Sequence, residues 1–178
     1  MKKLLIMLIL LFPVVILAQN YVGVDKCKTC HKKPDQGEQF GIWEKSKHAK
    51  AFETLKGEEA AKIAKEKGLT VAAYEAPECL KCHVTGYDAP ADKKEDKFKA
   101  EDGVQCETCH GPGSEYKSKK VMQDRKAAIE KGMAAILVKD GSAEKQCITC
   151  HNSESPTHKE FKFAEMWEKI KHPVPAGK

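Results

Sequence analysis

The chain has 178 residues, of which 41% are hydrophobic and 32% are charged, and its formal net charge is +5. This composition is typical of one globular domain and excludes a fibrous or disordered chain. Arg125 is the single arginine, and the lysines are interspersed with acidic residues. Both facts argue against a groove built for phosphate recognition, so nucleic acid is not an expected partner.

Residues 1–18 have the pattern of a secretory signal peptide. Two lysines open the chain, an apolar run covers 4–17, and Ala18 is a small residue suited to cleavage. A membrane anchor is the alternative. However, the run contains Pro13, and it is too short to span a bilayer, which takes about 20 residues. We therefore expect an exported domain of residues 19–178, with a net charge of +3 and no transmembrane segment after signal cleavage.

Hydrophobic periodicity predicts four helical segments, which cover residues 40–55, 58–67, 121–138 and 161–171. His48 lies on the apolar face of the first of these. Gly68 ends the second helix, and Pro173 ends the last one near His172. No stretch shows the alternation of a β-strand, so the predicted fold is mainly α.

All eight cysteines fall in four pairs of one spacing, Cys-x-x-Cys, and a histidine follows each pair directly. The four motifs consist of Cys27, Cys30 and His31; Cys79, Cys82 and His83; Cys106, Cys109 and His110; and Cys147, Cys150 and His151. Four such coincidences in a chain with seven histidines are not accidental.

The spacing of these motifs is the signature of covalent c-type haem attachment. Two thiols in one helical turn add across the two vinyl groups of one haem, and the next residue places its imidazole under the iron. Zinc sites would combine two cysteine pairs per metal and would not need each histidine, and disulfides within this spacing are typical of redox-active sites. We therefore expect four covalently bound haems, and export agrees with this reading.

Four haems in a chain of this size leave roughly 40 residues for each, so the porphyrins must supply much of the buried apolar surface. The predicted architecture is one domain of short helices and loops wrapped around a four-haem cluster. We expect the chain without haem to be largely unfolded.

The remaining histidines limit how the irons are ligated. The candidates for distal iron ligands are His48, His158 and His172. Three histidines cannot serve four haems, so at least one iron is five-coordinate or takes Met, Lys or water, unless a neighbouring subunit donates a histidine. The methionines considered for this role, which also fit as helix packing, are Met122, Met133 and Met166.

Segments around these motifs resemble the tetrahaem cytochrome c-554 family, part of the wider cytochrome c-554 and c-prime group. The resemblance is carried by residues 43–55 with Ser46-x-His48-Ala49-x-Ala51, CLKCHVTGY at 79–87, CETCHGPG at 106–113 and FKFAEMWEKIKH at 161–172. It implies a mainly helical fold with close, partly stacked haems.

The resemblance also implies that His48 and His172 are distal ligands and that the haem held by Cys79, Cys82 and His83 is five-coordinate. The family has a further distal histidine shortly after the CHGPG segment, whereas residues 114–120 contain none. Either His158 takes that role or a second iron is open.

We therefore expect a periplasmic electron carrier, and not an enzyme, that exchanges electrons with other periplasmic or membrane-bound redox proteins. An extracellular location is the alternative to the periplasm. The alternative functions are reduction of a small nitrogen oxide at an open haem and assembly into a haem filament.

Overall fold

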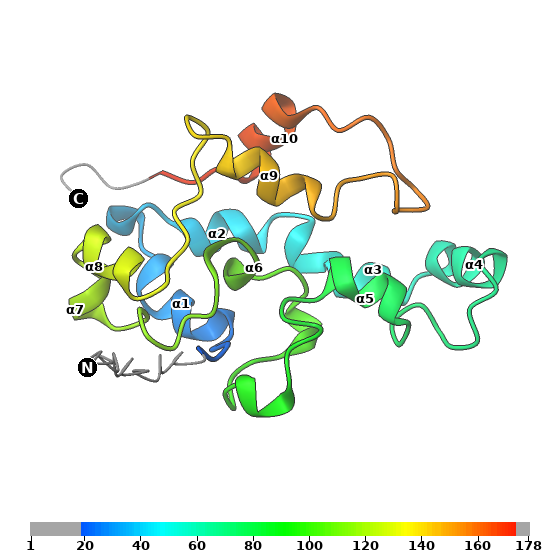
Figure 1. Ribbon diagram of the computed structural model, residues 1–178, viewed down its shortest axis with the longest axis horizontal. Helices are drawn as coiled ribbons and strands as arrows, with labels where there is room; N and C mark the ends of the chain where they lie inside the picture. The colour runs from blue at the N-terminus through cyan, green and yellow to red at the C-terminus, as the bar shows by residue number, and fades with distance from the viewer. Residues whose placement is uncertain (1–18, 174–178) are drawn as a thin grey trace, which may run out of the picture.

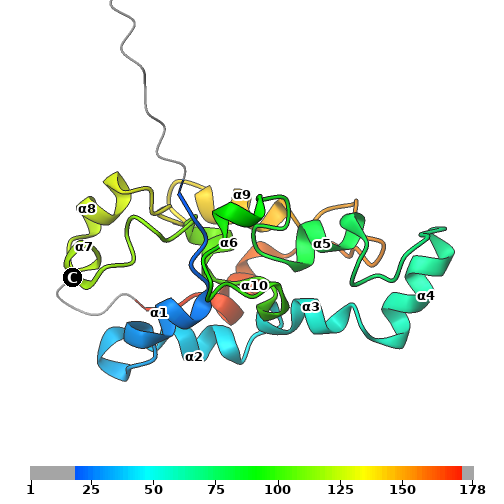
Figure 2. The same cartoon turned by 90° about the horizontal axis from the view of Figure 1, so that it is seen from below.

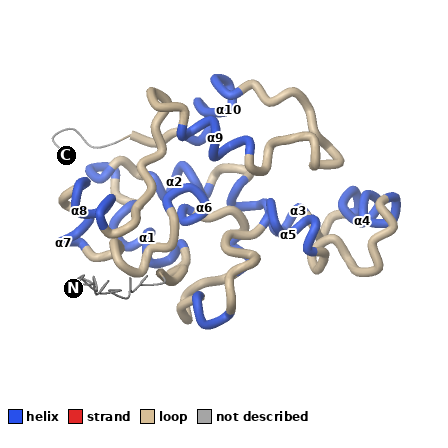
Figure 3. Tube along the Cα trace, viewed as in Figure 1, coloured by secondary structure: helices blue, strands red, loops and turns tan. Residues whose placement is uncertain are grey.

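Short helices joined by long loops form the described part of the chain, residues 19–173 of the computed structural model (Figures 1 and 3). The α-helices are α1 (Val24–His31), α2 (Gln39–Glu44), α3 (Ala51–Thr54), α4 (Glu58–Glu66), α5 (Pro77–His83), α6 (Cys106–His110), α7 (Lys119–Met122), α8 (Arg125–Glu130), α9 (Ser142–Ile148) and α10 (Phe163–Ile170). The 3₁₀ helices are η1 (Pro34–Gln36), η2 (His48–Lys50), η3 (Ala91–Lys93) and η4 (Ala100–Asp102). The predicted mainly α fold is confirmed.

Residues 19–173 contain no β-strand, and Tyr21 and Lys94 form an isolated parallel bridge. No helix in the same range is long and apolar enough to cross a bilayer. The predicted signal peptide, residues 1–18, lies outside the described residues.

Two of the predicted helices are confirmed. The segment 58–67 forms α4, which ends before Gly68, where φ is +69°. The segment 161–171 forms α10, which ends at Ile170, three residues before Pro173. Both segments end at residues that stop helices for local reasons, a glycine of positive φ and a proline.

The prediction of one continuous helix over 40–55 is wrong, because the chain breaks into α2, η2 and α3. Trp43 Nε1 donates to Val104 O at 2.7 Å, and Val104 N donates to His48 O at 3.1 Å. Ser46 turns the chain between these contacts, since its N–H bonds Trp43 O three residues back. Tertiary contacts to residue 104 therefore override the local helical preference.

The prediction of one helix over 121–138 is also wrong. The Asp124 carboxylate accepts from Lys126 N at 2.9 Å and Ala127 N at 3.1 Å, which caps the start of α8 and separates it from α7. Gly132, with φ of +94°, ends α8. The residues that follow run as irregular backbone whose carbonyl groups are free to accept other hydrogen bonds.

Helix α6 lies at the centre of the molecule, with α4 at one end and α7 and α8 at the other (Figures 1 and 2). The polypeptide around α6 has a polar interior: Thr85, Gln105 and Glu107 are 1%, 2% and 3% exposed. Gln105 Oε1 accepts from Val24 N at 2.8 Å, and Gln105 N donates to Thr85 Oγ1 at 2.7 Å. These bonds bind the start of α1 and the segment after α5 to the N-terminal side of α6.

Glu107, one of the two residues between the cysteines of α6, anchors the N-terminal segment. Its carboxylate accepts from Val22 N and Gly23 N, each at 2.9 Å, and from Gly113 N at 2.7 Å. Burial raises the pKa of Glu107, while its three backbone donors lower it. The hydrogen bonds to Val22 N and Gly23 N fix the start of α1 against α6.

The described apolar core is small. Leu55, Ala64 and Ala73 form a buried cluster that joins α3, α4 and the segment before α5, and Cys79 and Leu80 pack against it. Several large apolar side chains remain exposed, namely Val71, Tyr74, Ile129, Val138, Ile148 and Met166. A helical protein with this little buried apolar side-chain volume is the type of chain in which a bound apolar group supplies part of the core.

Candidate haem-binding sites

Each Cys-x-x-Cys-His motif lies on a short helix or the turn that continues it. The first three motifs are contained in α1, α5 and α6. In the fourth, α9 ends at Ile148, and His151 N still donates to Cys147 O at 3.0 Å. None of the eight cysteines is in a disulfide. Both thiols of a motif therefore belong to one turn, as covalent attachment to a single porphyrin requires.

Three of the four motif histidines have their Nδ1 atom next to a protein oxygen. The pairs are His31 with Gln39 Oε1 at 3.1 Å, His83 with Ala51 O at 2.7 Å and His110 with Ala134 O at 3.0 Å. Because an oxygen partner accepts, the ring proton resides on Nδ1 and the Nε2 lone pair is free. This is the tautomer and orientation that a metal-ligating imidazole needs.

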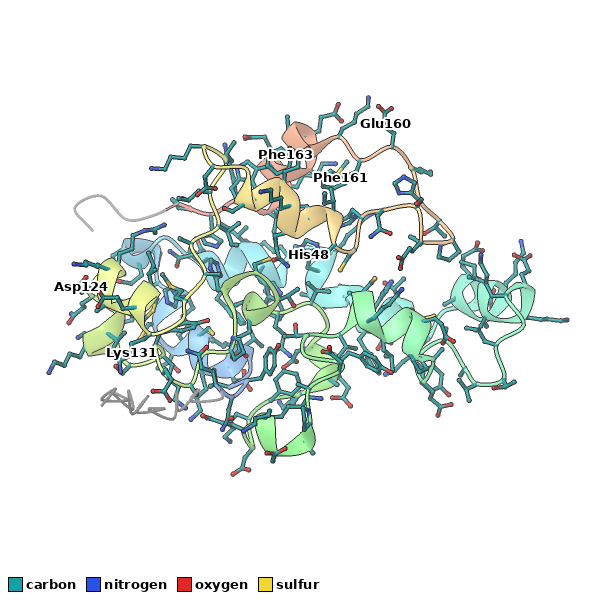
Figure 4. All side chains as sticks on the ribbon, viewed as in Figure 1. His48, Asp124, Lys131, Glu160, Phe161 and Phe163 are labelled. Carbon is teal, nitrogen blue, oxygen red and sulfur yellow. The ribbon has the colours of Figure 1, made fainter. Side chains whose placement is uncertain are left out.

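The fourth motif histidine is oriented by ring stacking. Phe161 lies against the His151 ring, with 4.8 Å between ring centroids and an interplanar angle of 18°. Phe161 comes from the loop before α10 and lies beside α9 in Figure 4. Sequence reasoning did not identify Phe161, Gln39 or the Ala51 and Ala134 carbonyls, because nothing in the local pattern marks an oxygen or a ring that meets its partner only in the fold.

Two of the three candidate distal histidines face motif histidines. The ring centroids of His48 and His151 are 6.1 Å apart, and those of His110 and His172 are 5.9 Å apart. Two imidazoles that bind opposite sides of one metal at about 2 Å have ring centres about 6 Å apart. Both pairs therefore have the separation of axial ligands that share one iron.

His48 is held in place by a close backbone approach. Its carbonyl accepts from Val104 N, and a Cβ on Gly103 would come within 2.8 Å of that carbonyl oxygen. Gly103 has φ of +70°, so glycine serves both the conformation and the contact. Figure 4 shows His48 in the middle of the molecule, below α9.

The surroundings of these imidazoles favour the neutral form. Partial desolvation by the surrounding protein lowers the pKa of His48, His110 and His151. It also lowers the pKa of His172 to about 4, with smaller contributions there from His110 and then His31. A neutral imidazole is the form that binds a metal.

His158 has a different setting. It is exposed, and its N–H closes a turn with Ser155 O at 3.0 Å. Its loop is tied to α5 by an ion pair between Lys81 and Glu154 at 2.5 Å. Within residues 19–173, no ring pair joins His158 to a motif histidine, so its role as a ligand stays a prediction.

The first, third and fourth motifs are neighbours in space. Helices α1 and α6 are in contact, and the neighbouring Cys106 thiol raises the pKa of Cys27. Gln146 Nε2, on α9, donates to Thr108 O on α6 at 3.0 Å. Motifs that are distant in sequence therefore present their thiols to one another across α6.

The second motif adjoins the fourth. Burial and the neighbouring Cys150 thiol raise the pKa of Cys82 to about 11. The ion pair between Lys81 and Glu154 joins the same two regions on the outside. The first motif thus contacts the third, the third contacts the fourth, and the fourth contacts the second.

This arrangement fits four separate haem sites better than shared zinc sites. A zinc site needs about four ligands that converge on one point. In the described part of the chain, no three His, Cys, Asp or Glu side chains are grouped so as to hold one metal ion. The unbridged cysteine pairs, the oriented Nδ1 atoms and the two facing imidazole pairs all suit a haem, which would be held by two sulfurs and an imidazole at each motif.

Comparison with known proteins agrees with the chemistry of these sites. Residues 26–111 match the family described as cytochrome c554 and c-prime. Cytochrome c-554 of Nitrosomonas europaea is 32% identical over 140 residues, which are 74% of this chain and 57% of that protein. The chain thus spans less than two thirds of the length of the curated relative it matches.

The solved structure of reduced cytochrome c554 from Nitrosomonas europaea superposes with a TM-score of 0.57 and 26% identity. The match covers 88% of this chain and 86% of that one. The family match includes the first two motifs and the third up to Gly111, and the structural match extends over nearly all of the described fold. The chain is therefore similar in both sequence and fold to the cytochrome c554 and c-prime family.

Proposed function

We propose that this chain is an exported electron carrier with four covalently bound c-type haems. Members of the cytochrome c554 and c-prime family are c-type cytochromes, which hold haem by thioether bonds. The cysteines that would form these bonds are Cys27, Cys30, Cys79, Cys82, Cys106, Cys109, Cys147 and Cys150. The proximal iron ligands would be His31, His83, His110 and His151.

The observation that carries this proposal is the contact between motifs. Each motif adjoins at least one other through helix contact, a hydrogen bond or neighbouring thiols. Haem, when bound, supplies reversible one-electron chemistry at its iron. The protein contributes proximity, because it keeps four such groups side by side in the order first, third, fourth and second motif.

The facing imidazoles assign two distal ligands. His48 would complete the coordination of the iron bound by His151, and His172 that of the iron bound by His110, at the separations of 6.1 and 5.9 Å given above. Two imidazole ligands hold an iron six-coordinate in both oxidation states, which keeps the structural change on electron transfer small. These two sites are therefore suited to electron relay.

The start of the chain supports a location outside the cytoplasm. The basic and apolar start of the chain supports export to the periplasm, the compartment in which c-type haem attachment takes place. The partners would be other periplasmic or membrane-bound redox proteins.

A second candidate function is reduction of a small nitrogen oxide at an open haem. The second motif favours this function. Among residues 19–173, no imidazole ring faces His83 in the way that the His48 ring faces His151. The resemblance to the cytochrome c-554 family implies the same open iron.

A redox titration of the purified haem-loaded protein, combined with an assay of nitric oxide consumption, separates the two functions. A carrier takes up and releases four electrons reversibly and does not turn over nitric oxide. Sustained nitric oxide consumption by the reduced protein would favour the enzyme. A protein that cannot be reoxidised by any protein or chemical oxidant would contradict the carrier.

A further inference from the structure

The structure places each of the seven histidines of this chain. All seven lie within residues 19–173, and four of them belong to the motifs. His48 and His172 face His151 and His110. Within this chain, a histidine for the distal side of the iron bound by His31 could therefore come only from position 158.

The fold separates His158 from the first motif. Its loop, residues 152–162, extends beside α5, and the ion pair between Glu154 and Lys81 holds it there. Helix α1 lies toward the opposite end of the molecule in both views (Figures 1 and 2). Residues 114–120 of the chain also contain no histidine. No histidine is thus placed to bind the sixth position at the first motif.

The proximal side of the first motif is held by a side chain and not by a backbone carbonyl. Gln39 Nε2 donates to Gln36 O at 2.5 Å and to Pro173 O at 3.1 Å, which fixes the amide so that its Oε1 faces His31 Nδ1. Gly37 makes room for this arrangement, because a Cβ there would come within 2.6 Å of Gln39 Nε2. Gln39 therefore orients the His31 ring and accepts its N–H.

We propose that the haem of the first motif has an open sixth position, which binds small uncharged diatomic ligands such as carbon monoxide or nitric oxide, and that Gln39 is the positioning residue of its proximal histidine. The inference rests on the proposed attachment of haem to Cys27 and Cys30. The open iron at the first motif would be additional to the one proposed at the second motif. Ligand binding here forms one iron–ligand bond and transfers no electron.

Resonance Raman spectroscopy of the reduced, haem-loaded protein tests this directly, since the iron–histidine stretching band is seen only for five-coordinate haem. Removing the acceptor in Gln39→Leu makes His31 a weaker donor to iron and shifts one such band to lower frequency. Gln39→Glu, of equal size, supplies a stronger acceptor and shifts the same band to higher frequency. Gln123→Leu, at an exposed position, is the matched control and leaves all bands unchanged.

Carbon monoxide provides a second readout. The band that responds to Gln39 disappears when carbon monoxide occupies the open iron. If no iron–histidine band responds to either Gln39 substitution, Gln39 does not position an open haem and the inference is wrong. If the haem of the first motif gives a low-spin ferric EPR signal, its sixth position is filled, which also overturns the inference. A protein whose mass lacks four haems would instead contradict the proposed function, so the two failures are distinguishable.

Discussion

Replacing the buried Glu107 carboxylate should strongly destabilise the haem-loaded protein. Glu107 is 3% exposed and accepts hydrogen bonds from the backbone N–H groups of Val22, Gly23 and Gly113. Glu107→Ala leaves these three donors without their acceptor. At about 1–2 kcal/mol for each unpaired buried N–H, the substitution lowers the free energy of unfolding by about 3–6 kcal/mol.

Urea denaturation of the purified haem-loaded protein, followed by far-UV circular dichroism, measures this loss. With a slope of about 2 kcal/mol per molar urea, the midpoint falls by about 1.5–3 M. Glu107→Gln keeps one acceptor but places an amide N–H₂ among the donors, so its midpoint falls between those of the alanine variant and the unchanged protein. Glu78→Ala, which removes an exposed carboxylate beside Cys79, is the control and changes the free energy by less than about 0.5 kcal/mol.

Equal midpoints for the Glu107→Ala and Glu78→Ala variants would refute the reasoning. The carboxylate would then not be the acceptor that holds the N-terminal segment on α6.

Three further predictions concern the ligands, the turn at Ser46 and the role of haem in folding. His48→Ala leaves four haems attached but converts one low-spin ferric EPR signal to high spin, because the His151 iron loses its facing imidazole; an unchanged spectrum contradicts the pairing. Trp43→Phe removes the 2.7 Å bond to Val104 O and lowers the free energy of unfolding in urea by about 1 kcal/mol, whereas no change in midpoint would show that this bond adds nothing. A chain with all eight cysteines replaced by alanine cannot attach haem and lacks the helical circular dichroism of the native protein, since its apolar core is small; native helicity in that variant would contradict this account.

The local parts of the fold could be predicted from the sequence. Gly68 and Pro173 predicted the ends of α4 and α10 where the structure has them, and the motif spacing predicted the four proposed haem sites. Signals of this kind depend on residues within one or two helical turns, so a single sequence contains them in full.

The parts that could not be predicted depend on contacts between distant segments. The break at Ser46 results from bonds of Trp43 and His48 to Val104, 61 residues after Trp43 in the first case. The segment after Gly132 is not helical, and the Ala134 carbonyl accepts from His110 Nδ1. The residues that neighbour Val104 and Ala134 in the sequence do not indicate that these two residues take part in such hydrogen bonds.

For the candidate ligands, too, the sequence predicts one part and the other part depends on contacts between distant segments. Sequence counting established that three spare histidines cannot serve four irons, but the facing pairs of His48 with His151 and of His172 with His110 needed the fold. Nothing in the sequence marks Glu107, between two cysteines of one motif, as buried, because acidic residues are usually exposed. Its burial depends on the backbone of residues 22 and 23, more than 80 positions away.

Intact mass spectrometry of the protein purified after export, under denaturing conditions, tests the central claim most directly. Covalent attachment at all four motifs predicts the mass of the polypeptide plus four haems, with no free thiol left to alkylate. A mass that corresponds to the polypeptide alone, or eight thiols that can all be alkylated, would contradict the account.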